Sequence, residues 1–272
     1  MSRKGDHTIE AWVDQKLMRG KNAFSLDELR KDYPNHTEVA IKSALIRLSV
    51  KAKILSIHKG YYLIITPQYA SRGILPPTLY MDGLMNYLER PYYMGLINAA
   101  VLHGSSHQAP QEYFVFTSFP VLRPTLKKGL KVNYISKKEI PLSLLDQRKT
   151  ESGYLFISNP LLTAADLVQF EKKVGGLNRV ASILQDLVES IKPDSITKSF
   201  VEYIHTSTLQ RLGYLLETVI KEFVLADVLY DHMSGYSKRS RPVLLKASIP
   251  SKNLNADNRW NVVVNTEIQL EE

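Results

Sequence analysis

The sequence contains no cysteine among its 272 residues, and this absence excludes several kinds of chemistry. Disulfide bonds, zinc sites built on thiolates and cysteine nucleophiles all need a sulfur that the chain does not supply. A protein without disulfides suits a reducing compartment, so we expect it to be cytoplasmic.

Long apolar runs are also missing. No stretch approaches the roughly 18 consecutive apolar residues that a membrane-spanning helix requires. The first residues, MSRKGDHTIEAW, lack the apolar segment of a secretory signal. We therefore expect a soluble protein without a membrane partner.

The motifs of several enzyme classes are absent as well. The sequence has neither the G-x-S-x-G elbow of serine hydrolases nor the P-loop of nucleotide hydrolases. A metal-dependent nuclease needs clustered carboxylates with a nearby lysine. Residues 171–173 (Glu-Lys-Lys) follow a helical run, and Glu267, Glu271 and Glu272 have no matching lysine. We predict a protein that is not an enzyme and has no cofactor and no metal, with a DNA-processing enzyme as an alternative.

Positive charge is what the chain has in excess. Its formal net charge is +8 and its pI about 9.4, which favours an anionic partner. Residues 1–66 carry 12 lysines and arginines against 7 aspartates and glutamates, a net charge of +5. The other 206 residues carry 23 against 20, a net charge of +3. The excess is concentrated in the first quarter of the chain.

That first quarter is predicted to contain three helices and a hairpin. A first helix is expected at about residues 7–19 from its apolar spacing. Ser25 and Glu28 form a capping box for a short second helix, and Thr37 begins a third. Lys59-Gly60 is a turn signal between two short strands. This order is typical of a winged helix-turn-helix, which we place at residues 1–66.

A helix held by two others can enter the major groove of DNA, and a hairpin wing can reach the adjacent backbone. Winged helices also serve as protein-interaction modules, but the local charge favours DNA. The residues predicted to contact DNA lie at the start of the third helix, on its exposed side and at the wing tip: Asn35, His36, Thr37, Lys42, Ser43, Arg47 and Lys59.

After a connector rich in proline and glycine at residues 67–77, we place a larger domain at residues 78–272. Strands are expected in EYFVFTS, KVNYIS and GYLFIS, and helices from Pro160 onward, with Asn159 as an N-cap. The tail contains two short strand candidates, PVLLKA and WNVVVN. Because helices and strands are segregated rather than alternating, the predicted fold class is α+β.

The stretch YYMGLINAAVLHGSSHQAPQEYFVFTS is predicted to be a helix followed by a strand. His103 and His107 have the i, i+4 spacing of a zinc-binding pair. However, Gly104 occupies the position where zincins have glutamate, and the glycine and serines are typical of a helix end. We therefore interpret both histidines as structural residues at a helix–strand junction.

The stretch SGYSKRSRPV contains a second basic cluster. Tyr236, Lys238, Arg239 and Arg241 could bind nucleic acid or an acidic protein surface, because arginine pairs with both phosphate and carboxylate. A solvated loop is the equal alternative.

Several of these stretches together resemble the AbiEi-type antitoxins of bacterial abortive-infection (type IV) toxin–antitoxin systems. The resemblance rests on GYYLIITPQYASRGILPP, on LMNYLERPYYMGLINAAVLHGSSHQAPQEYFVFTS, on QRLGYLLE and on RWNVVVN. Within it, the structural signature comprises Tyr92, Tyr93, His103, Gly104, His107 and Gln108.

The resemblance implies an antiviral defence protein with two activities. Its winged helix would bind inverted repeats in double-stranded operator DNA and repress its own operon. Its C-terminal domain would counteract a cognate nucleotidyltransferase-like toxin, by direct contact or indirectly. The other hypotheses are a ligand-responsive transcriptional regulator without a toxin and the winged-helix-targeted enzyme.

Overall fold

The computed structural model describes residues 8–105, 110–235, 241–251 and 255–270. It contains both helices and sheets, and the predicted α+β class is confirmed. Within these described ranges, none of the helices has the length and apolar character needed to cross a membrane. The chain folds into two compact units. The first comprises Met1–Tyr93, Gln111–Ile140 and Gln147–Phe156; the second comprises Met94–Pro110, Pro141–Asp146 and Ile157–Glu272.

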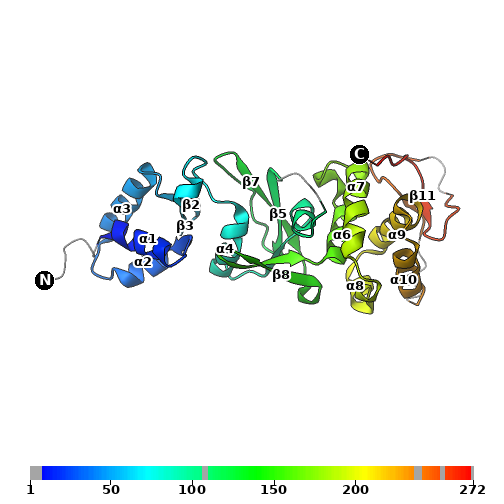
Figure 1. Cartoon of the computed structure of the whole chain (residues 1–272), viewed down its shortest axis with the longest axis horizontal. Helices are drawn as coiled ribbons and strands as arrows, with labels where there is room; N and C mark the ends of the chain where they lie inside the picture. Colours follow the sequence, from blue (N-terminus) through cyan, green and yellow to red (C-terminus); the bar gives the residue numbers. More distant parts are fainter. Residues whose placement is uncertain (1–7, 106–109, 236–240, 252–254, 271–272) are drawn as a thin grey trace. The chain divides into compact units, whose positions relative to one another are not determined.

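The N-terminal part of the first unit packs three helices beside a three-stranded antiparallel sheet (Figure 1). The helices are α1 (Ile9–Met18), α2 (Leu26–Asp32) and α3 (Glu38–Val50). The strands are β1 (Ala23–Ser25), β2 (Ile54–His58) and β3 (Tyr61–Ile64), in the order β1-β3-β2.

Local signals in the sequence begin these helices. The Ser25 hydroxyl accepts a hydrogen bond from the backbone amide of Glu28, and the Glu28 carboxylate accepts one from the Ser25 amide, at 3.1 and 2.9 Å. This is the predicted capping box. The Thr37 hydroxyl likewise accepts from the amide of Ala40 at 3.2 Å, so α3 begins where its sequence predicts.

The apolar stripe of α3 lies in the core of this region. Ile41, Ala44, Leu45 and Leu48 are all buried, as predicted. Strand β1 was not predicted: it places Phe24 in the same core and pairs with β3. A strand of three residues that ends on the helix cap Ser25 is too short to show the alternation that marks a strand.

A mixed six-stranded sheet follows, in the order β6-β7-β5-β4-β9-β8. Its strands are β4 (Tyr92–Met94), β5 (Glu112–Ser118), β6 (Thr125–Lys127), β7 (Leu130–Lys137), β8 (Leu145–Thr150) and β9 (Gly153–Ser158). Two helices accompany them along the chain, α4 (Met81–Tyr87) and α5 (Ile97–Leu102). β5 and β7 run parallel over seven paired residues, which accounts for two of the three predicted strands.

The prediction of a helix from Tyr92 onward is wrong at its start. Tyr92–Met94 forms β4, and the helix α5 covers only Ile97–Leu102. Leu96 has a φ of 54°, in the left-handed region, which separates strand from helix. Tyr93 is fully buried and stacks on Phe116 of β5 with ring centroids 4.7 Å apart. Burial of the tyrosines in the sheet overrides the helical spacing of the following residues.

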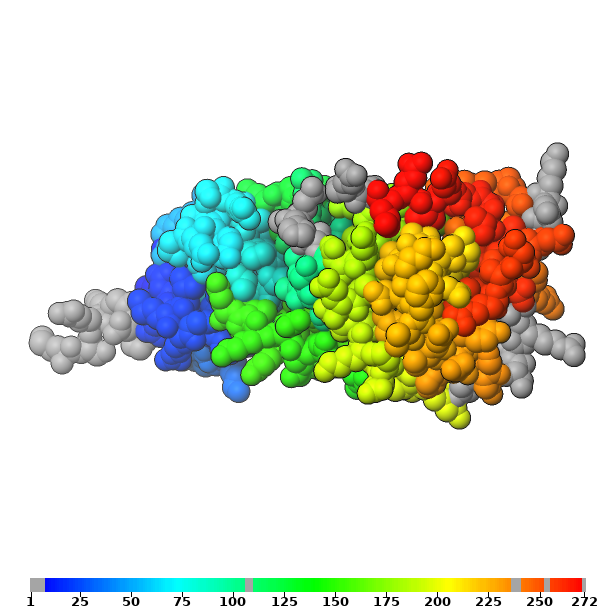
Figure 2. Space-filling model, turned by 45° about the vertical axis from the view of Figure 1, so that its right-hand side comes forward, coloured from blue at the N-terminus to red at the C-terminus, as the bar shows by residue number. Residues whose placement is uncertain are grey.

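The second unit is mainly helical. Besides α5, its longer helical elements are α6 (Pro160–Gln169), α7 (Leu177–Leu187), α8 (Lys198–Tyr203), α9 (Thr206–Tyr214), a π-helical segment η7 (Leu215–Ile220) and α10 (Phe223–Ser234). Asn159 caps α6 through a 2.8 Å hydrogen bond from the amide of Leu162, as predicted. In Figure 2 the C-terminal segment that carries β11 (red) lies against α9 (yellow to orange).

Two details of this unit differ from the prediction. The apolar spacing of residues 207–223 is that of one continuous helix, but α9 passes into η7 and the chain then breaks at Lys221, whose φ is 68°. The helix α10 was not predicted. The two tail strands were: β10 (Val243–Leu244) and β11 (Val262–Val263) form a short parallel pair.

Candidate nucleic-acid interface

The predicted DNA-contacting residues all lie at the surface of the α3 region. Lys42 and Arg47 are exposed on α3, and Lys59 is exposed in the turn between β2 and β3. Ser43 is half-buried. Asn35, His36 and Thr37, at the start of α3, are exposed.

Two of these residues already have partners within the chain. The Thr37 hydroxyl is engaged in capping α3. The His36 ring packs edge-on against Tyr33, with centroids 4.9 Å apart. Their side chains therefore hold the turn before α3, while the cations of α3 and of the β2–β3 turn extend to solvent.

The structure divides the predicted residues into two groups. Lys42 and Lys59 line a groove of about 740 Å³ between α3 and the β2–β3 turn. His36 and Arg47 line a separate depression of about 440 Å³ on the other side of α3. The exposed crest of α3 lines the groove together with Lys42 and Lys59.

The remaining residues of that crest were missed by sequence reasoning, because they are apolar. Val39, Ile46 and Val50 are 75%, 55% and 82% exposed. Their spacing places them on the side of the helix opposite the buried stripe. The signal was present in the sequence, since any residue opposite a buried helical stripe faces outward.

The cations around α3 differ from others nearby in having no acidic partner. Within the described residues, Lys42, Arg47 and Lys59 make no ion pair. In contrast, Lys53 pairs with Asp14 and Glu10 at 3.0 Å each. The positive charge at α3 is thus not neutralised from within the chain.

The one acidic residue at the edge of the groove is neutralised. Arg30 donates two hydrogen bonds to the Glu38 carboxylate, at 2.8 and 2.9 Å, and a third to Asp27 at 3.1 Å. The bonds from Arg30 lower the pKa of Glu38, and those to Glu38 and Asp27 raise the pKa of Arg30. Glu38 therefore remains ionised but paired, which reduces its repulsion of an anion bound in the groove.

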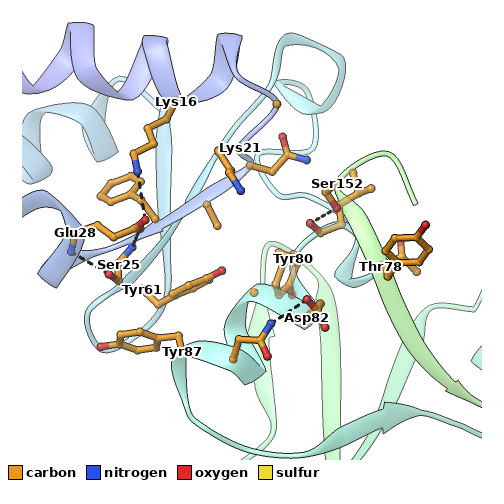
Figure 3. Close-up of a pocket in the computed structure, with 18 residues that line it drawn as sticks. Lys16, Lys21, Ser25, Glu28, Tyr61, Thr78, Tyr80, Asp82, Tyr87 and Ser152 are labelled. Atoms are coloured by element: carbon orange, nitrogen blue, oxygen red, sulfur yellow. Dashed lines mark hydrogen bonds and ion pairs between the residues drawn. The ribbon is translucent and has the colours of Figure 1, made fainter. Parts of the chain in front are cut away.

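The β2–β3 hairpin is held against α4 by two tyrosines (Figure 3). Tyr87 of α4 donates a hydrogen bond to the carbonyl of Lys59 at 3.2 Å, and a Cβ at Gly60 would overlap with its hydroxyl. Conversely, Tyr61 of β3 lies so close to Gly83 of α4 that a side chain at Gly83 would overlap with it. Both glycines are needed for this close approach.

A cavity of about 410 Å³ lies beside the contacts of Tyr61 and Tyr87 (Figure 3). Its polar side chains carry both signs of charge. Lys16 pairs with Glu28 at 3.2 Å, and Asp82 accepts hydrogen bonds from Asn86 and Tyr92 at 2.9 and 3.0 Å. The cavity therefore suits a neutral polar molecule better than an anion.

The histidine of the structural signature makes the contact expected of a junction residue. The His103 ring nitrogen Nε2 lies 2.8 Å from the carbonyl oxygen of Ser158, at the end of β9. Gly104 has a φ of +88°, which ends the helix. His107 and Gln108 lie outside the described residues. Among the residues that are described, no group of three histidines or carboxylates could hold a metal ion.

The tyrosines of the signature are buried in the first unit. Tyr92 donates a hydrogen bond to Asp82 at 3.0 Å, and burial, with the Asp82 charge, raises its pKa. Tyr93 stacks on Phe116, as described above. Both tyrosines thus support the sheet.

The two C-terminal motifs, QRLGYLLE and RWNVVVN, meet in the second unit. Gln210 donates hydrogen bonds to the carbonyls of Trp260 and Arg241 at 2.9 and 3.0 Å. The Trp260 ring packs on Gly213, where a Cβ would overlap with it, and its indole nitrogen donates to Glu217. We call Gln210, Gly213, Glu217, Arg259 and Trp260 the tryptophan cluster.

Arg259 completes the tryptophan cluster. It donates to Glu217 at 3.0 Å and to Asp227 at 2.6 Å, and its guanidinium lies 4.8 Å from the ring centre of Tyr230. The hydrogen bonds to Asp227 and Glu217 outweigh burial and raise its pKa. Every charged group in the cluster has a partner there, so the cluster attaches the C-terminal segment to α9, η7 and α10.

The second basic cluster is only partly described. Tyr236, Lys238 and Arg239 lie outside the described residues. Arg241 is exposed, and its carbonyl accepts the bond from Gln210. The suggested role of this loop stays a prediction.

Comparison with known proteins supports first a fold and then a family for part of the chain. The solved structure of the RV2827C protein from Mycobacterium tuberculosis has a similar fold, with a TM-score of 0.65. The alignment covers 92% of this chain and 89% of that one at 16% identity, which shows the fold alone. Residues 93–218 match the family model of the AbiEi antitoxin C-terminal domain. This match to part of the chain supports an AbiEi-type antitoxin. No curated protein matches it significantly.

Proposed function

We propose that this AbiEi-type antitoxin binds double-stranded operator DNA through residues 8–66, a winged helix-turn-helix, and thereby represses its own operon in the cytoplasm. The observation that carries the proposal is the exposed face of α3. Lys42, Arg47 and Lys59 have no acidic partner among the described residues and flank one helix. Unpaired cations on both sides of a helix suit the two phosphate backbones that border a major groove.

The second half of the proposal concerns the toxin. The match of residues 93–218 to an antitoxin domain supports a role in a toxin–antitoxin system, so we infer a cognate nucleotidyltransferase-like toxin as partner. The tryptophan cluster uses its polar groups internally, which makes it unsuitable as a contact surface. Antagonism could act through another surface or on the toxin's target, and co-expression with the neighbouring gene's product tests it by rescue of growth.

The DNA-binding half is tested by fluorescence anisotropy of the full-length protein. The probes are the DNA directly upstream of its gene and a scrambled duplex of equal composition, each across a salt series. We expect tighter binding to the native sequence and a steep loss of affinity with salt. Equal weak binding to both duplexes would overturn the proposal.

The cavity beside the wing favours one second candidate, a ligand-responsive regulator. A molecule bound among Lys21, Tyr61 and Asp82 would contact both the wing and α4. The discriminating experiment is a screen of neutral polar metabolites for a change in the thermal unfolding midpoint and in operator affinity. This candidate would be supported by a compound that changes both the unfolding midpoint and the operator affinity, together with the absence of a toxin gene beside the gene for this protein.

A further inference from the structure

The crest of α3 is apolar where a DNA-contacting helix would touch the bases. Val39, Ile46 and Val50, which we call the apolar ridge, are 75%, 55% and 82% exposed. Intervals of seven and four residues place them on one side of the helix. A row of exposed β-branched side chains places apolar surface in water, which is unfavourable, and a bound partner would bury that surface.

The ridge has polar borders on both sides. The ridge residues line the groove together with Lys42 and Lys59, and Arg47 lines the depression on the other side of α3. An apolar protein surface placed over the ridge would strip water from these cations without offering them partners. The DNA major groove offers both kinds of group, because phosphates border it and thymine C5-methyl groups line its floor.

The dimensions agree with this partner. Val39 and Ile46 are seven residues apart, about 10 Å along the helix axis. Consecutive bases of one strand are spaced by about 3.4 Å, so the two side chains span about three base steps. Arg30 pairs with Glu38 at the start of α3, which reduces the repulsion between this carboxylate and an approaching phosphate backbone.

We propose that Val39 and Ile46 are specificity-determining residues that recognise two thymine methyl groups about three base steps apart, while Lys42, Arg47 and Lys59 contact phosphates. The inference rests on the proposed DNA binding. It changes the expected basis of specificity, because apolar contacts to methyl groups replace hydrogen bonds to base edges.

The test removes the methyl groups and nothing else. The full-length protein first selects duplexes from a random-sequence pool. The selected duplex is then synthesised with thymine and with uracil at every thymine position, and anisotropy gives the affinity for each. Because burial of one methyl group changes affinity about fourfold, we expect roughly tenfold weaker binding to the uracil duplex.

The variant with both Val39→Ala and Ile46→Ala completes the test. It should bind the thymine duplex about tenfold more weakly and no longer distinguish thymine from uracil. Met18→Ala, which removes an apolar side chain that is 84% exposed on α1, is the matched control and should keep the discrimination. All these side chains are exposed, so folding is checked simply by circular dichroism.

Each contrary outcome has a distinct meaning. Strong preference for the selected sequence with equal affinity for its thymine and uracil forms overturns this inference and leaves the proposed function standing. A double variant that changes the sedimentation coefficient but not DNA affinity makes the ridge a protein interface and also overturns it. If the pool yields no preferred sequence, the proposed function itself fails.

Discussion

The exposed face of α3 and the tryptophan cluster use similar residue types in opposite ways. In the cluster, Arg259 has two carboxylates and two aromatic rings around it, and Trp260 is 1% exposed. On α3, Arg47 has no acidic partner among the described residues, and Ile46 is 55% exposed. In the sequence, the family resemblance pointed to the motifs of the cluster, and the excess of positive charge pointed to the α3 face. Only their surroundings distinguish a group that stabilises the fold from one that is available to a partner.

Substitutions in these two regions should therefore affect two different properties, folding stability and DNA affinity. Changes in the tryptophan cluster should lower the free energy of unfolding and leave DNA affinity intact in the protein that remains folded. Changes on α3 should do the reverse. The two tryptophans of the chain, Trp12 and Trp260, provide one fluorescent reporter for each unit.

The largest effect is expected for Trp260→Ala. The change removes a buried ring and leaves Glu217 and the Gly213 surface without their contacts, so we expect a loss of about 3–5 kcal/mol in the free energy of unfolding. Urea unfolding followed by circular dichroism measures it. Trp12, then the sole tryptophan, reports whether the first unit keeps its own transition. An unchanged urea midpoint would contradict the structural role of the cluster.

A smaller loss is expected for Gly213→Ala. The added methyl group would overlap with the Trp260 ring, which costs about 1–3 kcal/mol in an already packed site. Gly235→Ala is the matched control, because its added Cβ would meet only backbone atoms 3.8 Å away and its φ of −62° suits alanine. Thermal unfolding of both variants gives the comparison. Equal midpoints would mean that the ring can move aside.

On α3, Lys42→Ala and Arg47→Ala should weaken operator binding by about 1–3 kcal/mol if these side chains reach bases, and by less if they contact phosphates only. The further inference expects the smaller value, with a reduced salt slope for each variant. Lys192→Ala removes the same charge from an exposed position in the second unit and serves as the control. If neither variant alters the affinity, α3 does not lie in the groove.

The smallest expected effect is a pH dependence of the folding stability, which comes from the pairing of Glu38 with Arg30 in the first unit. Because Arg30 lowers the pKa of Glu38 below its ordinary value of 4.5, their pairing stabilises the folded state above that pH. The contribution is lost as the pH falls through the lowered pKa of the folded state. Glu38→Gln should therefore reduce the stability slightly at pH 7 and not at all at pH 2, measured by urea midpoints. An equal decrease at both values would assign the effect to packing.

Part of the fold and of the site was predictable because it depends on near neighbours. The capping box of Ser25 and Glu28, the cap at Asn159 and the turn at Lys59-Gly60 each involve residues within a few positions of one another. The exposure of Lys42 and Arg47 follows from the same helical spacing that buries Ile41 and Leu48. The apolar ridge follows from that spacing too, but charge alone does not point to it.

The failures involve residues that are far apart in the chain. Tyr92–Met94 became a strand because Tyr93 stacks on Phe116. The break at Lys221 ends a helix that its apolar spacing would continue. At Tyr93, packing against a distant ring outweighs the local preference for a helix, because helix and strand propensities differ by less than the free energy that burial of an aromatic ring contributes.

The sequence by itself determined where most helices and strands begin, which side of α3 is buried and how much positive charge the first quarter carries, because each depends on local spacing or composition. The tertiary structure alone decided which charged side chains are engaged in ion pairs. Lys53 reaches Asp14 across 39 positions, and Arg259 reaches Glu217 across 42, whereas Lys42 and Arg47 reach no acidic group in the described chain. Pairing depends on distances in space, and those exist only after the chain has folded.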